Sequence, residues 1–269
     1  MGVLDLTNGY SDIKTFLEKQ EDLGDDLLAL KRVAENWMSN SPLDVGESGT
    51  IYRFVKFHDW KNKITRTIIK RGTLESRSIC DNPRIINYTL QKLLELDNKT
   101  TQWATMAYLL GDRRKVSNPP VKLGVTYEAV KDWETARKDK NCWQSRDDKT
   151  LENQARAFVN LMKTGIISFK PEQAEDYCFA RVFGLMTSEK IEEIFPSLRG
   201  HETDRIEEME TAIQEADKKG YVSSRDHRIV QAIAMRMSYM GDKVAFENPN
   251  CVSKSWPKFW DFMDYCKKK

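Results

Sequence analysis

The spacing of hydrophobic residues predicts a chain in which helices alternate with short strands. In most of the longer segments, apolar residues recur every three or four positions, which is the period of a helix with one buried face. The expected helices span residues 12–18, 25–38, 83–96, 103–110, 151–162, 171–186 and 206–216. A further helix opens at residues 223–228, and a short one ends the chain.

Shorter runs rich in β-branched residues predict strands between these helices. They cover residues 43–45, 65–70, 121–125, 165–169, 190–194, 220–222 and 243–248. Residues 51–57, which follow a glycine-rich turn, fit either a helix or a strand. The alternation of strands and helices is typical of an α/β fold.

One polar segment predicts a boundary between two domains. Residues 134–149 are almost entirely polar or charged, apart from Cys142 and Trp143. A chain of 269 residues is long enough for two domains of ordinary size. We therefore expect an N-terminal domain at residues 1–140 and a C-terminal domain at residues 141–269.

Composition narrows the classes of function. The chain has 43 basic and 41 acidic residues, and this near-neutral balance argues against a dedicated nucleic-acid binder. No apolar run is long enough for a membrane span, and residues 1–20 have no signal-peptide pattern, so we expect a cytoplasmic protein. The five cysteines form no C-x-x-C pair, which leaves a zinc site without support. A glycine-rich nucleotide-binding motif is also absent.

The helix that opens with Asp226, His227 and Arg228 is the strongest candidate for chemistry. An acid suited to capping precedes an arginine at the positive end of the helix dipole. Such an arrangement suits an anionic ligand. The plainer interpretation is a capped surface helix in which Arg228 forms a salt bridge.

Two further segments of the second half extend this candidate into a family resemblance. They are Gly200-His201-Glu202-Thr203-Asp204-Arg205 and Val252-Ser253-Lys254-Ser255-Trp256-Pro257. Together with Asp226-His227-Arg228, and in this order, they resemble the motifs of the C-terminal half of the EPSP synthases, a family of enolpyruvyl transferases. In the first half, Glu47-Ser48-Gly49-Thr50-Ile51-Tyr52-Arg53, Arg77-Ser78-Ile79 and Thr100-Thr101-Gln102 are similar to further family segments.

The resemblance implies a fold and a reaction. The fold would have two lobes, each an inside-out α/β barrel built from strand–helix repeats, here shortened. The reaction would transfer the enolpyruvyl group of phosphoenolpyruvate to a hydroxyl of shikimate 3-phosphate or a similar acceptor, with release of phosphate. Its partners would be small phosphorylated or carboxylated substrates, and it would need no metal and no organic cofactor.

The resemblance also implies roles for individual residues. Phosphoenolpyruvate would be held by Arg205, Arg228 and Lys254 with help from Gly49 and Arg77, and Arg53 would belong to the same substrate-binding set. The phosphate of the acceptor would be held by Thr100, Thr101 and Gln102, for which plain helix capping is the alternative. Glu202 would move a proton at the methylene carbon, and either Glu175 or Asp176 would accept the proton of the attacking hydroxyl. His201 stands where the family has a lysine.

Departures from the family pattern support a second hypothesis. Residues 1–24 contain no match to the family's opening segment of lysine, serine and arginine, and the chain is shorter than two full lobes. The alternative is therefore a catalytically reduced relative that only binds a phosphate- or carboxylate-bearing ligand or a protein partner.

Overall fold

The computed structural model divides the chain into two compact units, Met1–Ser145 and Arg146–Lys269. The structure describes residues 2–96, 100–111, 123–138, 149–172, 174–194 and 205–267. The domain boundary expected after residue 140 falls among residues 139–148, which lie outside the described ranges. Each unit is therefore considered by itself below.

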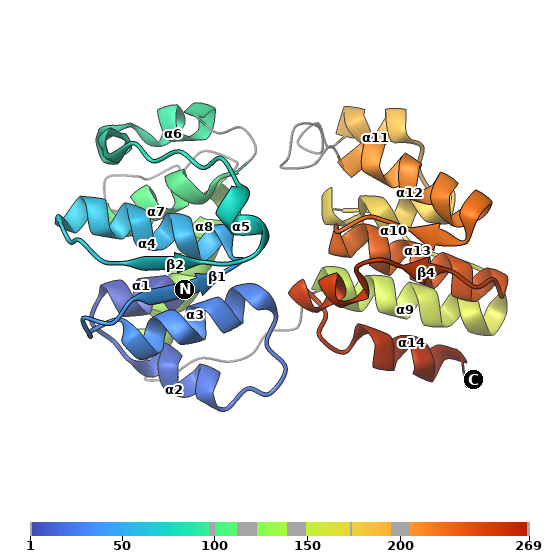
Figure 1. Ribbon diagram of the computed structural model, residues 1–269, viewed down its shortest axis with the longest axis horizontal. Coiled ribbons are helices and arrows are strands. Elements are labelled where there is room, and N and C mark those ends of the chain that lie inside the picture. The colour runs from blue at the N-terminus through green and yellow to red at the C-terminus, as the bar shows by residue number, and fades with distance from the viewer. Residues whose placement is uncertain are drawn as a thin grey trace. The chain divides into compact units, whose positions relative to one another are not determined.

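Unit 1 is mainly helical and contains one small sheet (Figure 1). Its elements are α1 (Gly2–Thr7), α2 (Asp12–Glu18), α3 (Asp25–Asn36), β1 (Leu43–Gly46), α4 (Gly49–Asn62), β2 (Ile68–Lys70), α5 (Thr73–Ser76), the 3₁₀ helix η1 (Pro83–Asn87), α6 (Leu90–Leu96), α7 (Gln102–Leu110) and α8 (Gly124–Lys138).

A strand–helix–strand module forms the middle of unit 1. Strands β1 and β2 pair in parallel, with Leu43 opposite Ile68, and α4 connects them. Helix α4 packs against α7, where Phe57 and Trp103 are buried in the core. Ser48 caps α4 by accepting a hydrogen bond from the Ile51 backbone N–H at 3.0 Å. This cap favours the helical alternative for residues 51–57, and α4 shows that they are helical.

Unit 2 is also mainly helical and contains one small sheet (Figure 1). Its elements are α9 (Lys149–Thr164), the 3₁₀ helix η4 (Ala174–Asp176), α10 (Tyr177–Val182), α11 (Ser188–Ile194), α12 (Arg205–Lys219), β3 (Tyr221–Val222), α13 (His227–Met240), β4 (Ala245–Phe246), the 3₁₀ helix η6 (Pro249–Lys254) and α14 (Phe259–Lys267).

Helix α13 is the central element of unit 2. It connects the parallel strands β3 and β4, in which Tyr221 lies opposite Ala245. One face contributes Ile229 and Ile233 to a core cluster with α10 and α12, and another contributes Val230 and Ala234 to a cluster with α9 and α14. A helix that is apolar on two faces is typically buried, as this one is.

Several expected strands are wrong. Residues 190–194 belong to α11, residues 165–169 have no regular secondary structure, and the described part of the expected strand 121–125 leads into α8. Short apolar runs fit a strand or one turn of a helix equally well, so the pattern alone could not decide. The helix expected at 83–96 is also interrupted, because Tyr88 is extended and Thr89 starts α6 by accepting from the Lys92 N–H at 3.2 Å.

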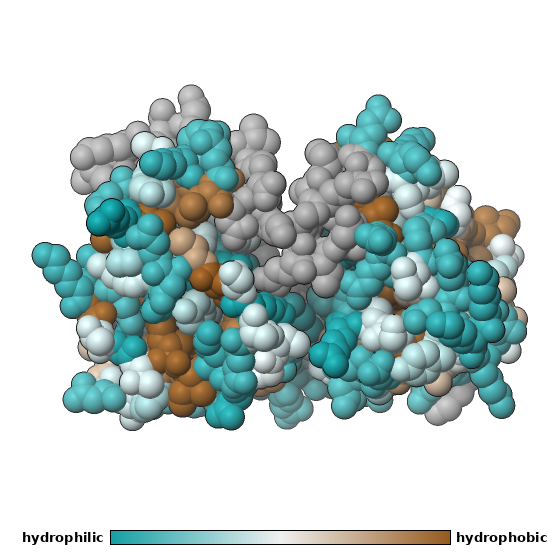
Figure 2. Space-filling model, turned by 45° about the horizontal axis from the view of Figure 1, so that its top comes forward, coloured by the Kyte–Doolittle hydropathy of each residue, from teal (hydrophilic) through white to brown (hydrophobic). Residues whose placement is uncertain are grey.

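The fold is mixed α/β and mostly helical. Two-stranded parallel sheets are the only sheets within the described ranges, and no closed barrel forms there. No described helix has the length and apolarity that a membrane crossing requires. On the face shown in Figure 2, hydrophilic side chains cover most of the surface and apolar ones form separate patches.

Candidate functional site

The residues singled out in the first half meet at the start of α4, and we name them the Arg77 cluster: Gly49, Thr50, Arg53, Arg77 and Gln102. The buried Arg53 donates from Nη1 to Gln102 Oε1 at 2.8 Å. Gln102 Nε2 in turn donates to Thr50 Oγ1 at 2.7 Å. This chain of hydrogen bonds fixes the orientation of the Gln102 amide and joins the starts of α4 and α7.

Because Gly49 has no side chain, two guanidinium groups can approach the N-terminus of α4. A methyl group at this position would lie 2.9 Å from Arg53 Nη1 and 3.5 Å from Arg77 Nη1. Arg77 is oriented by its Nη2, which donates to Thr73 Oγ1 at 2.9 Å. Two positive groups next to the positive end of a 14-residue helix repel each other unless an anion lies between them.

The two threonines before Gln102 do not both act as expected. Thr100 Oγ1 accepts from the Gln102 backbone N–H at 3.2 Å, so this hydroxyl serves the start of α7. Thr101 occupies the N-cap position of α7, where its side chain makes no capping bond. Capping by Thr100 thus agrees with the plainer of the two interpretations.

The residues singled out in the second half surround the start of α13, and we name them the Arg228 cluster: Arg205, Asp226, His227, Arg228 and Lys254. Asp226 Oδ1 accepts from the Arg228 backbone N–H at 2.8 Å and caps the helix. Asp226 Oδ2 accepts from Arg205 Nε at 2.8 Å. The carboxylate therefore ties α12 to the start of α13.

The charges of three cations act on His227, whose side chain is 14% exposed. The pKa of His227 is lowered to about 3, mainly by burial and also by the charges of Arg228, Lys254 and Arg205, against the opposite effect of Asp226. His227 is neutral at pH 7 as a result. Arg205, Arg228 and Lys254 thus all lie near enough to His227 for their charges to act on it, although they belong to α12, α13 and η6.

The polar ends of these cations are not all satisfied. Within the described residues, Arg228 Nη1 is buried and has no hydrogen-bond partner. A buried N–H group left without an acceptor costs roughly 1–3 kcal/mol, so such groups call for a ligand, a water or a strain argument. Lys254 is exposed at the end of η6, and Gln231 holds this segment by donating to the Val252 carbonyl at 3.3 Å.

The two candidate bases differ in their surroundings. Asp176 is buried, and its oxygens accept from Gln154 Nε2 at 2.8 Å and from the Glu172 backbone N–H at 3.0 Å. Glu175 is exposed, and its charge acts on Arg205. Both carboxylate oxygens of Asp176 are thus used in hydrogen bonds within unit 2. Glu175 is exposed and lies near enough to Arg205 for its charge to act there. Glu202 and His201 lie outside the described residues.

The sequence analysis did not identify Ser224 and Glu208, which are linked by hydrogen bonds to Asp226 of the Arg228 cluster. Ser224 Oγ donates to Glu208 Oε1 at 2.6 Å and accepts from the Asp226 backbone N–H at 3.0 Å. The sequence gives no signal for this contact, because the two side chains are 16 positions apart.

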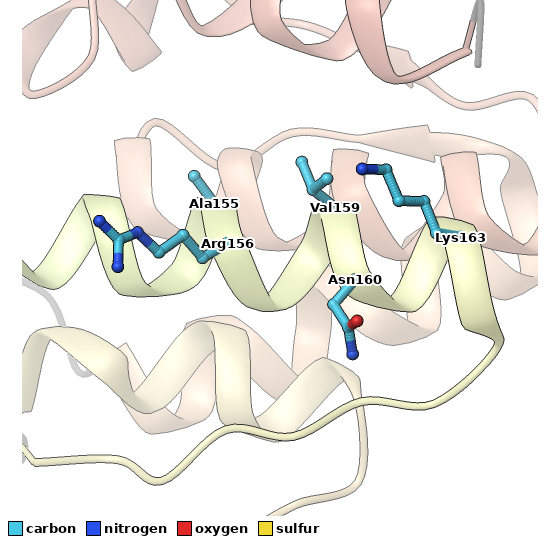
Figure 3. Close-up of a pocket in the computed structure, with 5 residues that line it drawn as sticks. All are labelled: Ala155, Arg156, Val159, Asn160 and Lys163. Atoms are coloured by element: carbon cyan, nitrogen blue, oxygen red, sulfur yellow. The ribbon is translucent and has the colours of Figure 1, made fainter.

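A shallow hollow elsewhere in unit 2 contains none of the predicted residues. Figure 3 shows that its five lining side chains, Ala155, Arg156, Val159, Asn160 and Lys163, all come from α9. Arg156 is exposed and pairs with Glu152 on the same helix. No described group of histidine, cysteine, aspartate and glutamate side chains is arranged to hold a metal ion.

Comparison of the chain with protein-family models, curated proteins and solved structures finds no match. The two clusters and the resemblance of their motifs are therefore the basis for assigning a function.

Proposed function

We propose that the protein is an enolpyruvyl transferase of the EPSP synthase type, with two shortened lobes that correspond to the two units. It transfers the enolpyruvyl group of phosphoenolpyruvate to a hydroxyl of shikimate 3-phosphate or a similar acceptor. The observation that carries the proposal is the Arg228 cluster, in which the charges of three cations act on His227 and Arg228 Nη1 is buried without an acceptor in the described residues.

The chemistry of phosphoenolpyruvate suits this cluster. Its carboxylate and phosphate oxygens are acceptors only, and guanidinium groups donate to such oxygens in pairs. Within the described residues Arg205 makes its one hydrogen bond through Nε, so its terminal amino groups remain for a ligand. Arg228 and Lys254 supply the other donors, and neutral His227 adds no further charge.

The Arg77 cluster suits a second anionic group. Arg53 and Arg77 approach Gly49 at the start of α4, and the backbone N–H groups of Gly49 and Thr50 make no hydrogen bond within the described residues. Helix N-termini of this kind bind phosphate and carboxylate oxygens. Gln102, fixed by Arg53 and Thr50, adds a polar group of defined orientation.

The proposed reaction is an addition followed by an elimination. The acceptor oxygen forms a bond to C2 of phosphoenolpyruvate while a base takes its proton, and Glu175 is the more accessible of the two candidates. An acid, proposed as Glu202, gives a proton to the methylene carbon. The C2–O bond to phosphate then breaks, the methyl carbon gives a proton back to Glu202, and inorganic phosphate leaves with the proton that the base had taken from the hydroxyl.

One observation favours a second function, the binding of such ligands without turnover. Both oxygens of Asp176 already accept hydrogen bonds from Gln154 and Glu172. If Asp176 is the base of the reaction, its two oxygens are already occupied by hydrogen bonds and are not placed to accept the proton of the acceptor hydroxyl. In that case the clusters bind phosphate- or carboxylate-bearing ligands, and no phosphate is released.

An assay of phosphate release with phosphoenolpyruvate and shikimate 3-phosphate separates the two functions. Transfer predicts release that depends on both substrates, and binding alone predicts heat of binding in calorimetry without release. Replacement Arg228→Gln is expected to weaken phosphoenolpyruvate binding at least tenfold, because it removes a charged donor pair.

The matched control is Arg225→Gln, which removes an exposed arginine three residues earlier in the same segment. Its affinity for phosphoenolpyruvate should stay within a factor of two of the parent protein. Equal affinity of the parent and Arg228→Gln would refute both functions, since both need this cation.

A further inference from the structure

Each unit has a buried serine two residues after the first strand of its strand–helix–strand module. Ser48 follows β1, which ends at Gly46, and Ser224 follows β3, which ends at Val222. In both units the hydroxyl donates to a carboxylate near the start of the preceding helix. The distances are 2.5 Å from Ser48 to Asp26 of α3 and 2.6 Å from Ser224 to Glu208 of α12.

In unit 2 this serine belongs to a closed chain of hydrogen bonds. Glu208 accepts from Ser224, and Ser224 accepts from the backbone N–H of Asp226. Asp226 accepts from Arg205, which lies one turn before Glu208 on α12. Both ends of the chain, Arg205 and Glu208, lie on α12, and Ser224 and Asp226 between them each take part in two of its bonds.

Helix capping alone does not account for Ser224. The cap of α13 is Asp226, whose side chain accepts from the Arg228 N–H. Ser224 instead orients the residue that caps, and its side chain is buried with both of its hydrogen bonds made. Glu208 faces the same region, because its charge acts on Cys178 and Cys251 beside Asp226.

We propose that Ser224 and Glu208 are positioning residues of the Arg228 cluster, with Ser48 and Asp26 as their counterparts at the Arg77 cluster. The inference rests on the proposed function, since it assigns a role toward the same anionic ligand. Ser224 and Glu208 hold Asp226 so that it binds Arg205 through Nε alone. The two terminal amino groups of Arg205 are thereby presented to the ligand.

The unit 1 pair supports the inference independently. Ser48 Oγ accepts from the Ile51 N–H and donates to Asp26, so its position fixes the first turn of α4. That turn carries Gly49, where the guanidinium groups of Arg53 and Arg77 approach. A hydrogen bond from a buried serine to a carboxylate thus occurs next to both cationic clusters.

The test compares Ser224→Ala, Ser224→Thr and Glu208→Ala in the full chain. The control is Ser223→Ala, which removes the neighbouring exposed hydroxyl and its bond to Glu215. Two properties are measured: the hydrogen exchange of the Arg205 Nε–H by NMR without ligand, and the affinity for phosphoenolpyruvate by calorimetry. The Nε–H signal is assigned by its loss in Arg205→Lys.

Positioning predicts that Ser224→Ala and Glu208→Ala speed up exchange of the Arg205 Nε–H and weaken phosphoenolpyruvate binding about tenfold. Ser224→Thr, which keeps the hydroxyl, should restore both, and Ser223→Ala should change neither. Unchanged exchange in both alanine variants would overturn the inference. If the parent protein does not bind phosphoenolpyruvate, the proposed function fails, while the exchange measurement still decides the positioning role.

Discussion

Replacement of Asp226 separates two contributions that this carboxylate makes to unit 2. Its side chain caps α13 through the Arg228 backbone N–H and pairs with Arg205 through Nε. The variant Asp226→Asn keeps an oxygen for the cap and removes the charge. The variant Asp226→Ala removes both.

The expected losses follow from the burial of the pair. The exposed fractions of the side chains are 7% for Asp226 and 19% for Arg205, so little water is available to replace a lost partner. Breaking a buried ion pair from one side costs about 3–5 kcal/mol, and the residual exposure of Arg205 favours the lower end. We expect Asp226→Asn to lower the free energy of unfolding by about 3 kcal/mol. Asp226→Ala should cost about 1 kcal/mol more, because the cap is also lost.

Hydrogen exchange of peptides from α13 measures these losses within unit 2, which a single unfolding midpoint of a protein with two units would not. The control is Asp217→Asn, which breaks a pair with Arg236 in which the aspartate is 41% exposed. Arg236 is only 18% exposed, but water reaches the carboxylate of Asp217, so this pair should contribute at most about 1 kcal/mol. Protection of α13 should therefore change little in this control.

Two outcomes would refute this reasoning. If Asp226→Asn loses no more protection than Asp217→Asn, the buried pair does not hold α12 against α13. If Asp226→Asn and Asp226→Ala lose the same amount, the hydrogen bond to the Arg228 N–H does not act as a cap.

Two further predictions concern a buried histidine and a buried acid. Burial lowers the pKa of His227 from 6.5 to about 3, so between these values the unfolded chain binds a proton that the folded protein does not. Between pH 7 and pH 4.5 the parent should therefore lose about 2.5 kcal/mol more protection of the α13 amides than His227→Gln in hydrogen exchange, and equal losses would contradict the low pKa. In unit 1, Asp5→Asn should lower the protection of α2 amides by about 3 kcal/mol. The fully buried Asp5 accepts hydrogen bonds from the Ile13 N–H at 3.0 Å and from Trp133 Nε1 at 3.1 Å, and it pairs with Arg137. Unchanged exchange of the α2 amides would show that these bonds do not stabilise α2.

Local signals in the sequence identified the helix starts that carry both clusters. Asp226 before an apolar helical pattern predicted a capped α13, and the structure has that cap. The motif resemblance selected Gly49, Arg53, Arg77 and Gln102, and these four lie together in unit 1. Each of these features depends on residue types within a few positions, which is what a sequence pattern can record.

Features that depend on distant pairing could not be read from the sequence. The bonds of Ser48 to Asp26 and of Ser224 to Glu208 join residues 22 and 16 positions apart. The segment 190–194 became a helix rather than a strand, because a run of five residues has no period long enough to distinguish the two. The sequence also could not show that Asp176 accepts hydrogen bonds from Gln154 and Glu172, whereas Glu175 is exposed.

The packing of α13 against two apolar clusters determines which parts of the Arg228 cluster can move quickly. Sliding or turning this helix would open voids on the side of Ile229 and force overlaps on the side of Val230. Adjustment is therefore left to the tips of long side chains such as Lys254, which change rotamer within nanoseconds. A shift of the whole of α13, of the kind that takes microseconds, would disturb both clusters.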